Sequence, residues 1–491
     1  MNFTIKDIDC IITSGETYKD IIPRTKEWVT HHFGSSPKVE ILHHQTAHIA
    51  SSFFQSGFDD AMCLSYDGVG DRASGAIAKA SKDKGIEIIE MFPKSRSLGN
   101  FYSTMTNFLG FKSNEDEYKV MGLAPYGNPN KIIPGNKKSY ADIFKKILIE
   151  KGKTGYQINL DLIDFYTKRD KWVTEKFISI FGNKRKPNEK ITNHHRNIAA
   201  ALQLRIEEVI LKQLRYLRKK YGLSKLCIAG GVGLNCSLNG KIVENKIFDE
   251  IFVQPASGDD GCTIGACLLA SKVKDVRFSP KVNHNSYLGS RFNNEQISKA
   301  LRESGLKFSK PQNYCQTVAQ LLSEGKIIAW FQGASEFGPR ALGNRSILCK
   351  PFPGEMKDHL NNNVKFRESF RPFAPAVLEE DQKNFFELKQ SSPHMLIACK
   401  VKKNAEKLIP AVVHIDKTCR VQTVKKKLNE KFYLLINEFK KITKIPVILN
   451  TSFNIKGQPI INNPEEAIKS FKNTKIDVLA IGDYIINKND Y

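Results

Sequence analysis

Two short apolar segments, each followed by a glycine-rich turn, constrain the fold of this chain most. Residues 61–66 and 226–229 are runs of small or apolar side chains of strand length, so each predicts a buried β-strand. Residues 74–78 look like a returning strand, which predicts a hairpin with its turn at 67–71. Glycine turns let a backbone approach a phosphate closely, although an ordinary strand-to-helix turn explains the second cluster equally well. The two turns read Asp67-Gly68-Val69-Gly70-Asp71 and Gly230-Gly231-Val232-Gly233-Leu234-Asn235.

Helical periodicity surrounds the second of these strands. Apolar residues recur at helical spacing through 197–220, which predicts a long amphipathic helix. A further short strand is predicted at 251–253, and a helix of small residues at 261–270. Strands that alternate with helices are typical of an α/β domain. We therefore expect an α/β domain over residues 1–276.

The second half of the chain has its own pattern. The helical pattern lapses into mainly polar residues around Pro280, so 277–286 is predicted to be a linker and 287–491 a second domain. Strands are predicted at 327–330, 447–450 and 478–481, with helices at about 430–442 and 464–471. Asn429 and Asn463 are the expected N-caps, and Pro464 would occupy the first position of its helix. This half is expected to be an α+β domain.

Composition and charge exclude several classes of protein. The chain has 491 residues, and its 75 Lys and Arg against 51 Asp and Glu give a net charge of +24. The excess favours an anionic partner, although a bias in codon usage also produces it. No run of 18 apolar residues and no apolar leader occur, so we expect a cytoplasmic protein without membrane contact. The ten cysteines form no CxxC pair, and Cys227, Cys262 and Cys267 are expected to be reduced core thiols.

Two histidines and two aspartates suggest a metal site. His44 and His48 are one helical turn apart, so on a helix both imidazoles can reach one metal ion. On spacing alone, a core or solvent-exposed pair is the more frequent outcome. Asp259 could complete a His-His-Asp site or could cap the following helix. Asp67 is a turn residue by default and a neighbour of metal or phosphate by hypothesis.

Fixed positive charge is concentrated in the second half. A guanidinium group can hold phosphate or carbamoyl oxygens with two hydrogen bonds, although a solvated basic face is the usual alternative. Arg371 argues against that alternative, because its neighbours Pro372 and Phe373 are apolar and unpaired charge among them would be costly. Asn450 and Ser452 follow a predicted strand and offer amide and hydroxyl donors. The cations in question are Arg340, Lys365, Arg367, Arg371 and Arg420.

Taken in order along the chain, these motifs resemble the O-carbamoyltransferases of the nodulation and tobramycin carbamoyltransferase type. The resemblance covers nearly the whole chain, and it depends on the ordered co-occurrence of several motifs rather than on any one. The motifs are His44-x-x-x-His48, residues 67–71, Ser97-Leu98-Gly99-x-Phe101-Tyr102-Ser103, Lys119-Val120-Met121-Gly122-Leu123-Ala124-Pro125-Tyr126-Gly127, and residues 336–348 and 450–457.

The resemblance implies a fold and a reaction. The first domain would be actin/sugar-kinase-like, and the second YrdC-like. Carbamoyl phosphate and ATP would form carbamoyl-adenylate at the second domain. The first domain would transfer the carbamoyl group to a hydroxyl of a small-molecule or glycan acceptor, with a divalent metal expected to be Fe²⁺. Family members carry a strand pair ahead of the region matched by residues 8–12, and we expect this chain to lack that hairpin and to expose a sheet edge there.

The resemblance also implies roles for individual residues. The metal ligands would be His44, His48 and Asp259. The catalytic residues would be Asp67, Arg340, Lys365, Arg420 and Ser452. Nucleotide and carbamoyl phosphate would be bound by Gly230, Gly231, Asn235, Arg371 and Asn450.

Other interpretations stay open at this point. They are a kinase of the same superfamily, a tRNA-modifying carbamoyl enzyme and a non-catalytic nucleic-acid-binding protein. No recognisable nucleic-acid motif accompanies the charge, so nucleic acid is not the expected partner. Residues 131–220 contain 22 Lys or Arg and nine Asp or Glu, so an anionic acceptor is a further hypothesis. A homodimer is compatible with the sequence.

Overall fold

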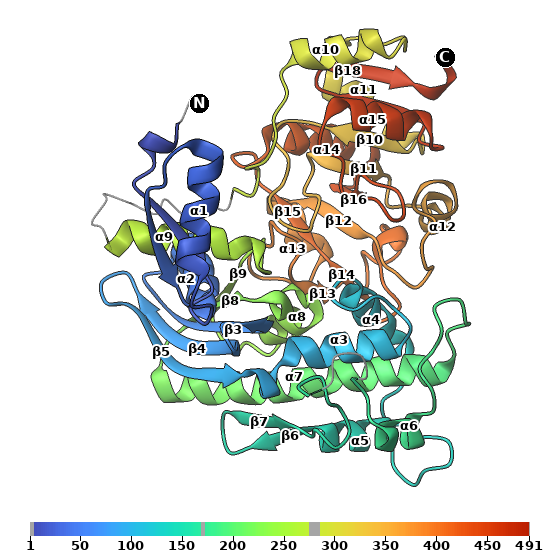
Figure 1. Ribbon diagram of the computed structural model, residues 1–491. Coiled ribbons are helices and arrows are strands. Elements are labelled where there is room, and N and C mark those ends of the chain that lie inside the picture. The colour runs from blue at the N-terminus through green and yellow to red at the C-terminus, as the bar shows by residue number, and fades with distance from the viewer. Residues whose placement is uncertain (1–3, 168–171, 274–284, 491) are drawn as a thin grey trace. The chain divides into compact units, whose positions relative to one another are not determined.

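The computed structural model describes residues 4–167, 172–273 and 285–490 (Figure 1). The chain divides into two compact units, Met1–Asn283 and His284–Tyr491. Each unit has a mixed β-sheet with packed helices, which confirms the predicted α/β and α+β classes. Most of the predicted linker lies outside the described residues.

The main sheet of the first unit has the strand order β5-β4-β3-β8-β9. Its first three strands form an antiparallel meander, β8 runs parallel to β3, and β9 runs parallel to β8. The actin/sugar-kinase-like fold expected for the first domain stays a prediction. The strands are β3 (Asp60–Gly70), β4 (Ala73–Ser81), β5 (Gly85–Pro93), β8 (Lys225–Ala229) and β9 (Glu250–Val253).

Two smaller sheets complete the strands found in the described part of this unit. β1 (Cys10–Ser14) pairs in parallel with β2 (Lys38–Leu42), and β6 (Leu148–Lys151) forms a hairpin with β7 (Gly155–Ile158). Within the described chain β1 has β2 as its one strand neighbour.

Helices cover both faces of the main sheet (Figure 1). Strand β3 alternates between them: Cys63 packs with Phe53 of α2 on one face, while the Tyr66 hydroxyl bonds Gln213 of α7 on the other. The helices are α1 (Ile21–Phe33), α2 (His44–Ser56), α3 (Leu98–Phe108), α4 (Glu117–Leu123), α5 (Tyr140–Ile147), α6 (Glu175–Phe181), α7 (Asn193–Tyr221), α8 (Cys236–Glu244) and α9 (Asp260–Val273). The long helix predicted for 197–220 is confirmed as α7.

The cysteines agree with the prediction except at one position. All ten lie within the described residues and are thiols outside any disulfide, and Cys227 and Cys262 are buried. Cys267 is exposed, so its assignment to the core is wrong. The reason is the helical period, because the buried side of α9 runs through Cys262, Gly265 and Ala266 and turns away at the next residue.

The first turn of α7 is held by a histidine. The backbone N–H of Thr192 donates to Nδ1 of His195 over 3.0 Å, as in a capping box. Burial, together with the neighbouring His194 and Arg185, lowers the pKa of His195 to about 4, against a weaker opposing effect of Glu189. His195 is therefore neutral in the folded protein near pH 7 and can accept this hydrogen bond.

Acid is expected to loosen the start of α7, because a protonated imidazole cannot accept the Thr192 N–H. Between pH 6.5, where an unfolded histidine titrates, and about pH 4, the opened helix binds more protons than the closed one. The free energy of opening therefore falls as the pH falls, and hydrogen-exchange protection at 196–200 should drop by at most about tenfold per pH unit. His195→Gln keeps an acceptor at this position and should lose part of that sensitivity. Equal acid sensitivity in both proteins would contradict the prediction.

The second unit is built on one seven-stranded sheet of order β15-β12-β16-β11-β10-β17-β18. The pairs β10–β17 and β12–β15 are parallel, and the other neighbours are antiparallel. The strands are β10 (Ile328–Phe331), β11 (Arg345–Cys349), β12 (Ala374–Leu378), β15 (Gln422–Val424), β16 (Val447–Ser452), β17 (Val478–Ile481) and β18 (Tyr484–Asn487), and β13 (Ala398–Lys400) pairs separately with β14 (Thr418–Arg420). The three strands predicted for this half are confirmed as β10, β16 and β17.

Two helices close the core of this sheet. Phe432 and Phe439 of α14 pack with Val318 of α11 against Trp330 and Ile448 of the strands. The predicted caps are confirmed, since Asn429 accepts the N–H of Phe432 and Asn463 accepts that of Glu466. The helices are α10 (Asn294–Glu303), α11 (Tyr314–Ser323), α12 (Met356–Leu360), α13 (Gln382–Phe385), α14 (Glu430–Thr443) and α15 (Pro464–Lys472).

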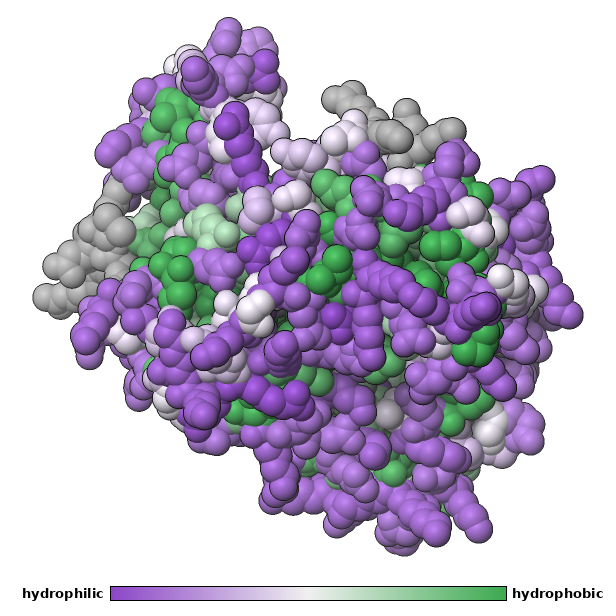
Figure 2. Space-filling view, turned by 90° about the horizontal axis from the view of Figure 1, so that it is seen from below, coloured by the Kyte–Doolittle hydropathy of each residue, from purple (hydrophilic) through white to green (hydrophobic). Residues whose placement is uncertain are grey.

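The surface is largely hydrophilic on the face shown in Figure 2, where apolar residues occur only in small groups. Most lysines and arginines described in 131–220 are exposed. Several of them have acidic partners, as in the ion pairs Lys212–Glu150 and Lys176–Asp161. These pairs favour the solvated basic face over a dedicated anion site. None of the described helices has the length and apolar character that a membrane crossing requires.

Candidate metal centre and anion-binding site

Helix α2 places two imidazoles side by side, as the spacing predicted. His44 is the first residue of the helix, and the preceding His43 accepts the N–H of Gln45 through its ring. The Nε2 atoms of His44 and His48 lie 3.1 Å apart, and both side chains are buried. The two rings therefore point their ε nitrogens at a common centre.

Asp67 lies within strand β3 and not in the turn, which corrects the sequence prediction. The strand continues to Gly70 because the ladder resumes at the pair Gly70–Ala73 after a bulge that follows Tyr66. The turn is formed by Asp71 and Arg72, which have φ angles of 50° and 62°. A bulge redirects a side chain, and the Asp67 Oδ2 atom lies 3.3 Å from Nε2 of His44.

Asp259 approaches the same histidines from the start of α9. Its Oδ1 atom lies 3.5 Å from Nε2 of both His44 and His48. One ligand atom from each of the four residues lies within 4.8 Å of the others. The fold thus brings together the three predicted metal ligands and Asp67, from segments nearly 200 residues apart in sequence.

Contacts among the four groups shift their pKa values. Burial opposes protonation of His44, but hydrogen bonds with Asp259 and Asp67 outweigh it and raise its pKa to about 9. The same balance raises the pKa of His48 above its usual value. Contacts with both histidines lower the pKa of Asp259 to about 2. Asp67 is more deeply buried, yet the histidines and the Gly231 N–H still hold its pKa well below the usual range.

The donor set fits a divalent transition metal. Two ligands about 2.1 Å from a metal lie ~3.0 Å apart at right angles and ~3.4 Å apart in a tetrahedron. The observed separations run from 3.1 Å between the histidines to 3.7 Å between His48 and Asp67. Imidazole and carboxylate ligands together suit iron, manganese or zinc. The residues present therefore fit the expected metal.

A third aspartate, missed by the sequence prediction, fixes the start of α2. The Asp71 carboxylate accepts the backbone N–H of His44 at 2.9 Å, and those of Gly15 and Thr17 at 3.2 Å. Burial opposes its charge, but these hydrogen bonds lower its pKa. The sequence offered one signal for this residue, because Asp71 is the last residue of the motif 67–71.

The predicted nucleotide residues lie beside Asp67. Gly230 has a φ of +83°, and a Cβ there would meet the Tyr66 carbonyl oxygen at 2.2 Å, so glycine is required. The Gly231 N–H donates to Oδ1 of Asp67 over 3.0 Å. Asn235 caps α8 and exchanges amide hydrogen bonds with Gln203. The glycines thus position Asp67, while a nucleotide-binding role for the three residues stays a prediction.

Close packing of α2 and α9 sets the geometry of this centre. A Cβ atom added at Gly265 would lie 1.8 Å from the carbonyl oxygen of Ala47. The two helices can therefore approach only with glycine at this position, and the approach keeps Asp259 near the histidines.

Gly265→Ala is expected to push α9 away from α2 and so weaken metal binding without removing a ligand. Overpacking of this kind costs roughly 1–3 kcal/mol of the free energy of unfolding. Calorimetric titration with a divalent metal and urea unfolding should both detect the change. Gly258→Ala is the control, since a Cβ there meets nothing within 4 Å. Equal metal affinity in the two variants would show that helix spacing does not govern the site.

In the second unit, Lys365 is buried at the end of a π-helical turn, Asn361–Lys365. Its Nζ donates to the Ser452 carbonyl at 2.9 Å and to Oδ1 of Asn454 at 2.8 Å. Burial, with further effects of Arg367 and Arg371, lowers the pKa of Lys365 well below its usual value. Asn454 is a contact that the sequence prediction missed, although it lies within the matched segment 450–457.

The remaining predicted cations surround the ends of β12 and β16, which are neighbours in the sheet. Arg367 lies over the ring of Phe373, 4.0 Å from its centroid, and Arg371 pairs with Glu368 at 3.4 Å. Asn450 donates to the carbonyl oxygen of Ala341, which places the Arg340 loop beside it. Arg420 ends β14, and that strand packs against β12. The predicted residues of this unit are therefore brought to one region of the sheet.

A half-buried glutamate and a buried arginine, which were also not predicted, shape the loop that follows Arg340. Glu336 accepts the backbone N–H groups of Leu342 and Asn344 at 2.7 Å each, and that of Arg345 at 3.2 Å. Burial raises its pKa. The Arg345 guanidinium lies 3.7 Å from the centroid of the Phe331 ring and donates to backbone carbonyls. Both residues are structural, and both fall in the matched segment 336–348.

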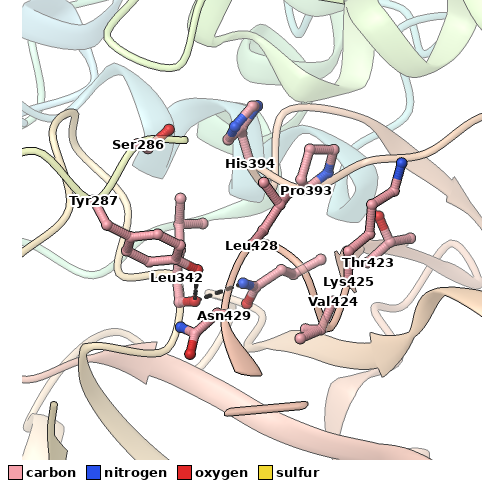
Figure 3. Close-up of a pocket in the computed structure, with 11 residues that line it drawn as sticks. Ser286, Tyr287, Leu342, Pro393, His394, Thr423, Val424, Lys425, Leu428 and Asn429 are labelled. Carbon is pink, nitrogen blue, oxygen red and sulfur yellow. Dashed lines mark hydrogen bonds between the residues drawn. The ribbon is translucent and has the colours of Figure 1, made fainter. Parts of the chain in front are cut away.

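A small, open pocket adjoins these residues (Figure 3). The hydroxyl of Tyr287 and the amide nitrogen of Gln422 both donate to the Leu342 carbonyl oxygen, at 2.8 and 2.7 Å. Gln422 also accepts a hydrogen bond from Asn450 over 2.8 Å. The pocket therefore shares a wall with the predicted substrate residues. Its other lining residues include Ser286, Pro393, His394, Thr423, Val424, Lys425, Leu428 and Asn429.

Comparisons with known proteins identify the family. The carbamoyltransferase N-terminus family matches residues 17–268, and the carbamoyltransferase C-terminus family matches residues 319–488. The nodulation protein NolO of Bradyrhizobium diazoefficiens is 39% identical over 455 residues, which cover 91% of this chain and 79% of that protein. The nodulation protein NolNO of Sinorhizobium fredii is 38% identical over 92% of this chain and 64% of its own length.

Solved structures overlap with the chain only in part. Full-length HypF in the phosphate- and nucleotide-bound form aligns with a TM-score of 0.30 at 16% identity, over 55% of this chain and 40% of that one. The family assignment therefore depends on sequence. This protein is a transferase, and it belongs to the carbamoyltransferase family.

Proposed function

We propose that this chain transfers a carbamoyl group from carbamoyl phosphate to a hydroxyl group in an ATP-dependent reaction that passes through carbamoyl-adenylate. The observation that carries the proposal is the group of four ligand atoms from His44, His48, Asp67 and Asp259, in a chain of the carbamoyltransferase family. The second unit would form the adenylate, and the first unit would transfer the carbamoyl group.

The cations of the second unit support adenylate formation. Water would first hydrolyse carbamoyl phosphate to carbamate and inorganic phosphate. A carbamate oxygen would then attack the α-phosphorus of ATP, and pyrophosphate would leave. Lys365, Arg340, Arg371 and Arg420 would neutralise the phosphate oxygens, which carry charge throughout the step. Ser452 and Asn450 would donate hydrogen bonds beside them. The described contacts of Lys365 are all oxygens without formal charge, so an incoming anion would supply the missing counter-charge.

The four-ligand group of the first unit supports the transfer step. His44, His48 and Asp259 would hold a divalent cation, and Fe²⁺ is the metal that we propose. Such a cation acts as a Lewis acid toward the carbamoyl oxygen. Asp67 would hold both imidazoles in place from the β3 bulge, and Gly231 would fix Asp67 through its N–H. The buried histidines would also exclude water from the carbamoyl group before the acceptor hydroxyl attacks.

We propose a small-molecule or glycan acceptor. The exposed basic residues of 131–220 have acidic partners at several positions, so an anionic acceptor or a nucleic acid is the weaker alternative. The proposed reaction consumes ATP and carbamoyl phosphate, which is consistent with a cytoplasmic location.

The proposal is tested with the full chain by two assays on one preparation. The first follows pyrophosphate release from ATP with and without carbamoyl phosphate. The second follows the label of ¹⁴C-carbamoyl phosphate into a panel of hydroxyl acceptors. Pyrophosphate release that requires carbamoyl phosphate supports the adenylate pathway. Phosphorylation of the acceptor in place of carbamoylation would indicate a kinase and contradict the proposal.

A further inference from the structure

A cysteine lies close to the same histidine pair but outside the group that contains the carboxylates. Cys262 belongs to the buried side of α9 that packs against α2, and its side chain is 7% exposed. Its Sγ atom and one ring nitrogen each of His44 and His48 lie within 4.8 Å of one another. Asp67 and Asp259 form a separate group with the same two histidines, to which Cys262 does not belong.

A buried cysteine is often a small apolar residue, but the surroundings of Cys262 differ from that case. Cys63 and Cys227 show the ordinary pattern, because they pack among Phe53, Ala76 and Phe252 in the apolar core of the first unit. Cys262 instead contacts the side chain of His48. The polar neighbours of its sulfur are therefore the two imidazoles and the backbone carbonyl oxygen of His44, to which the thiol donates over 4.0 Å.

We infer that Cys262 is a metal ligand, and that with His44 and His48 it forms a sulfur-containing site for a soft divalent cation such as Zn²⁺ or Cd²⁺. This inference deepens the metal site of the proposed function. The two histidines would be shared by two ligand sets, one completed by carboxylates and one completed by a thiolate. Binding through sulfur would release the thiol proton to solvent as the metal–sulfur bond forms.

The chemistry of the ligands explains what a second set would do. Thiolate favours soft cations, while carboxylate favours hard cations such as Mn²⁺. A Zn–S bond is ~2.3 Å long and a Zn–N bond ~2.1 Å, so a tetrahedral site needs sulfur and nitrogen about 3.6 Å apart. The observed limit of 4.8 Å leaves about 1 Å of adjustment, which a side-chain rotation at the first turn of α9 supplies. The chain would accordingly bind soft and hard cations in different ways at one pair of histidines.

The test is a titration of the metal-free, full-length protein with Cd²⁺, followed by thiolate-to-metal charge-transfer absorption in the ultraviolet. We expect one equivalent of Cd²⁺ to produce the band, and Cys262→Ala to remove it and to weaken Cd²⁺ binding by at least about tenfold. Cys227→Ala is the matched control, since it removes a buried thiol of the same unit, and it should keep the band. Mn²⁺ affinity, measured by electron paramagnetic resonance, should be unchanged in both variants.

The outcomes separate this inference from the proposed function. Cd²⁺ binding without the band, or a band that persists in Cys262→Ala, would overturn the thiolate ligand and leave the carboxylate site in place. Failure of the unaltered protein to bind either Cd²⁺ or Mn²⁺ would overturn both. Loss of Mn²⁺ binding in Cys262→Ala would show that the cysteine only supports the fold of the site, which would also overturn the inference.

Discussion

His44→Ala should abolish carbamoyl transfer while pyrophosphate release that depends on carbamoyl phosphate continues. The substitution removes an imidazole that contacts His48, Asp67 and Asp259 at 3.1–3.5 Å. The adjacent His43 is engaged in capping α2 and is not in a position to replace it. We expect the transfer rate to fall by about 10²-fold or more, as when a preorganised electrostatic contact is lost. Bound metal, measured by atomic emission, should fall with it.

The control for this experiment is His31→Ala, which removes an exposed histidine of the same unit. It should leave metal content and both half-reactions unchanged. A folded His44→Ala protein that has lost both half-reactions would contradict the division of labour between the two units. Full transfer activity in that protein would remove His44 from the reaction altogether.

Lys365→Met should have the opposite effect, with adenylate formation lost and metal content kept. Methionine fills a similar volume but leaves the Ser452 carbonyl and the Asn454 amide oxygen without their shared donor. It also removes a buried cation that we propose faces the phosphates. We expect pyrophosphate release to fall by about 10²-fold or more. The assay is pyrophosphate release at saturating ATP with carbamoyl phosphate varied.

Lys350→Met is the matched control in the second unit. The Lys350 ammonium group is partly buried and likewise donates to a backbone carbonyl, that of Ser323 at 3.2 Å, so its substitution also removes a charged donor from this unit. Unchanged pyrophosphate release in Lys365→Met would move the adenylating site away from the β12 and β16 ends. A release rate lowered equally by both substitutions would point to a general effect on stability.

Local patterns in the sequence predicted the local structure well. The period of apolar residues gave α7, and the caps of α14 and α15 were correctly assigned to Asn429 and Asn463. The four-residue spacing also placed His44 and His48 on one helix face. Each of these features depends on residues within a few positions of one another, so the sequence contains the whole signal.

Contacts between distant segments were not predictable in the same way. The bulge that carries Asp67 depends on pairing with β4, and the hydrogen bonds of Asp71 join segments 56 and 27 residues away. The bonds of Lys365 to Ser452 and Asn454 cross nearly 90 residues. The period of apolar residues indicates that an element exists, whereas its neighbours are determined by packing of the whole unit.

The Asp71 carboxylate joins residues 15–17, which follow β1, to the first residue of α2, which is also a candidate metal ligand. Docking of that early segment and occupation of the metal site are consequently linked equilibria. Such coupling is reciprocal. If docking of residues 15–17 raises the metal affinity by some factor, bound metal raises the equilibrium constant for docking by the same factor. A molecule that binds residues 15–17 and alters their docking would therefore be expected to change metal affinity without contacting a metal ligand.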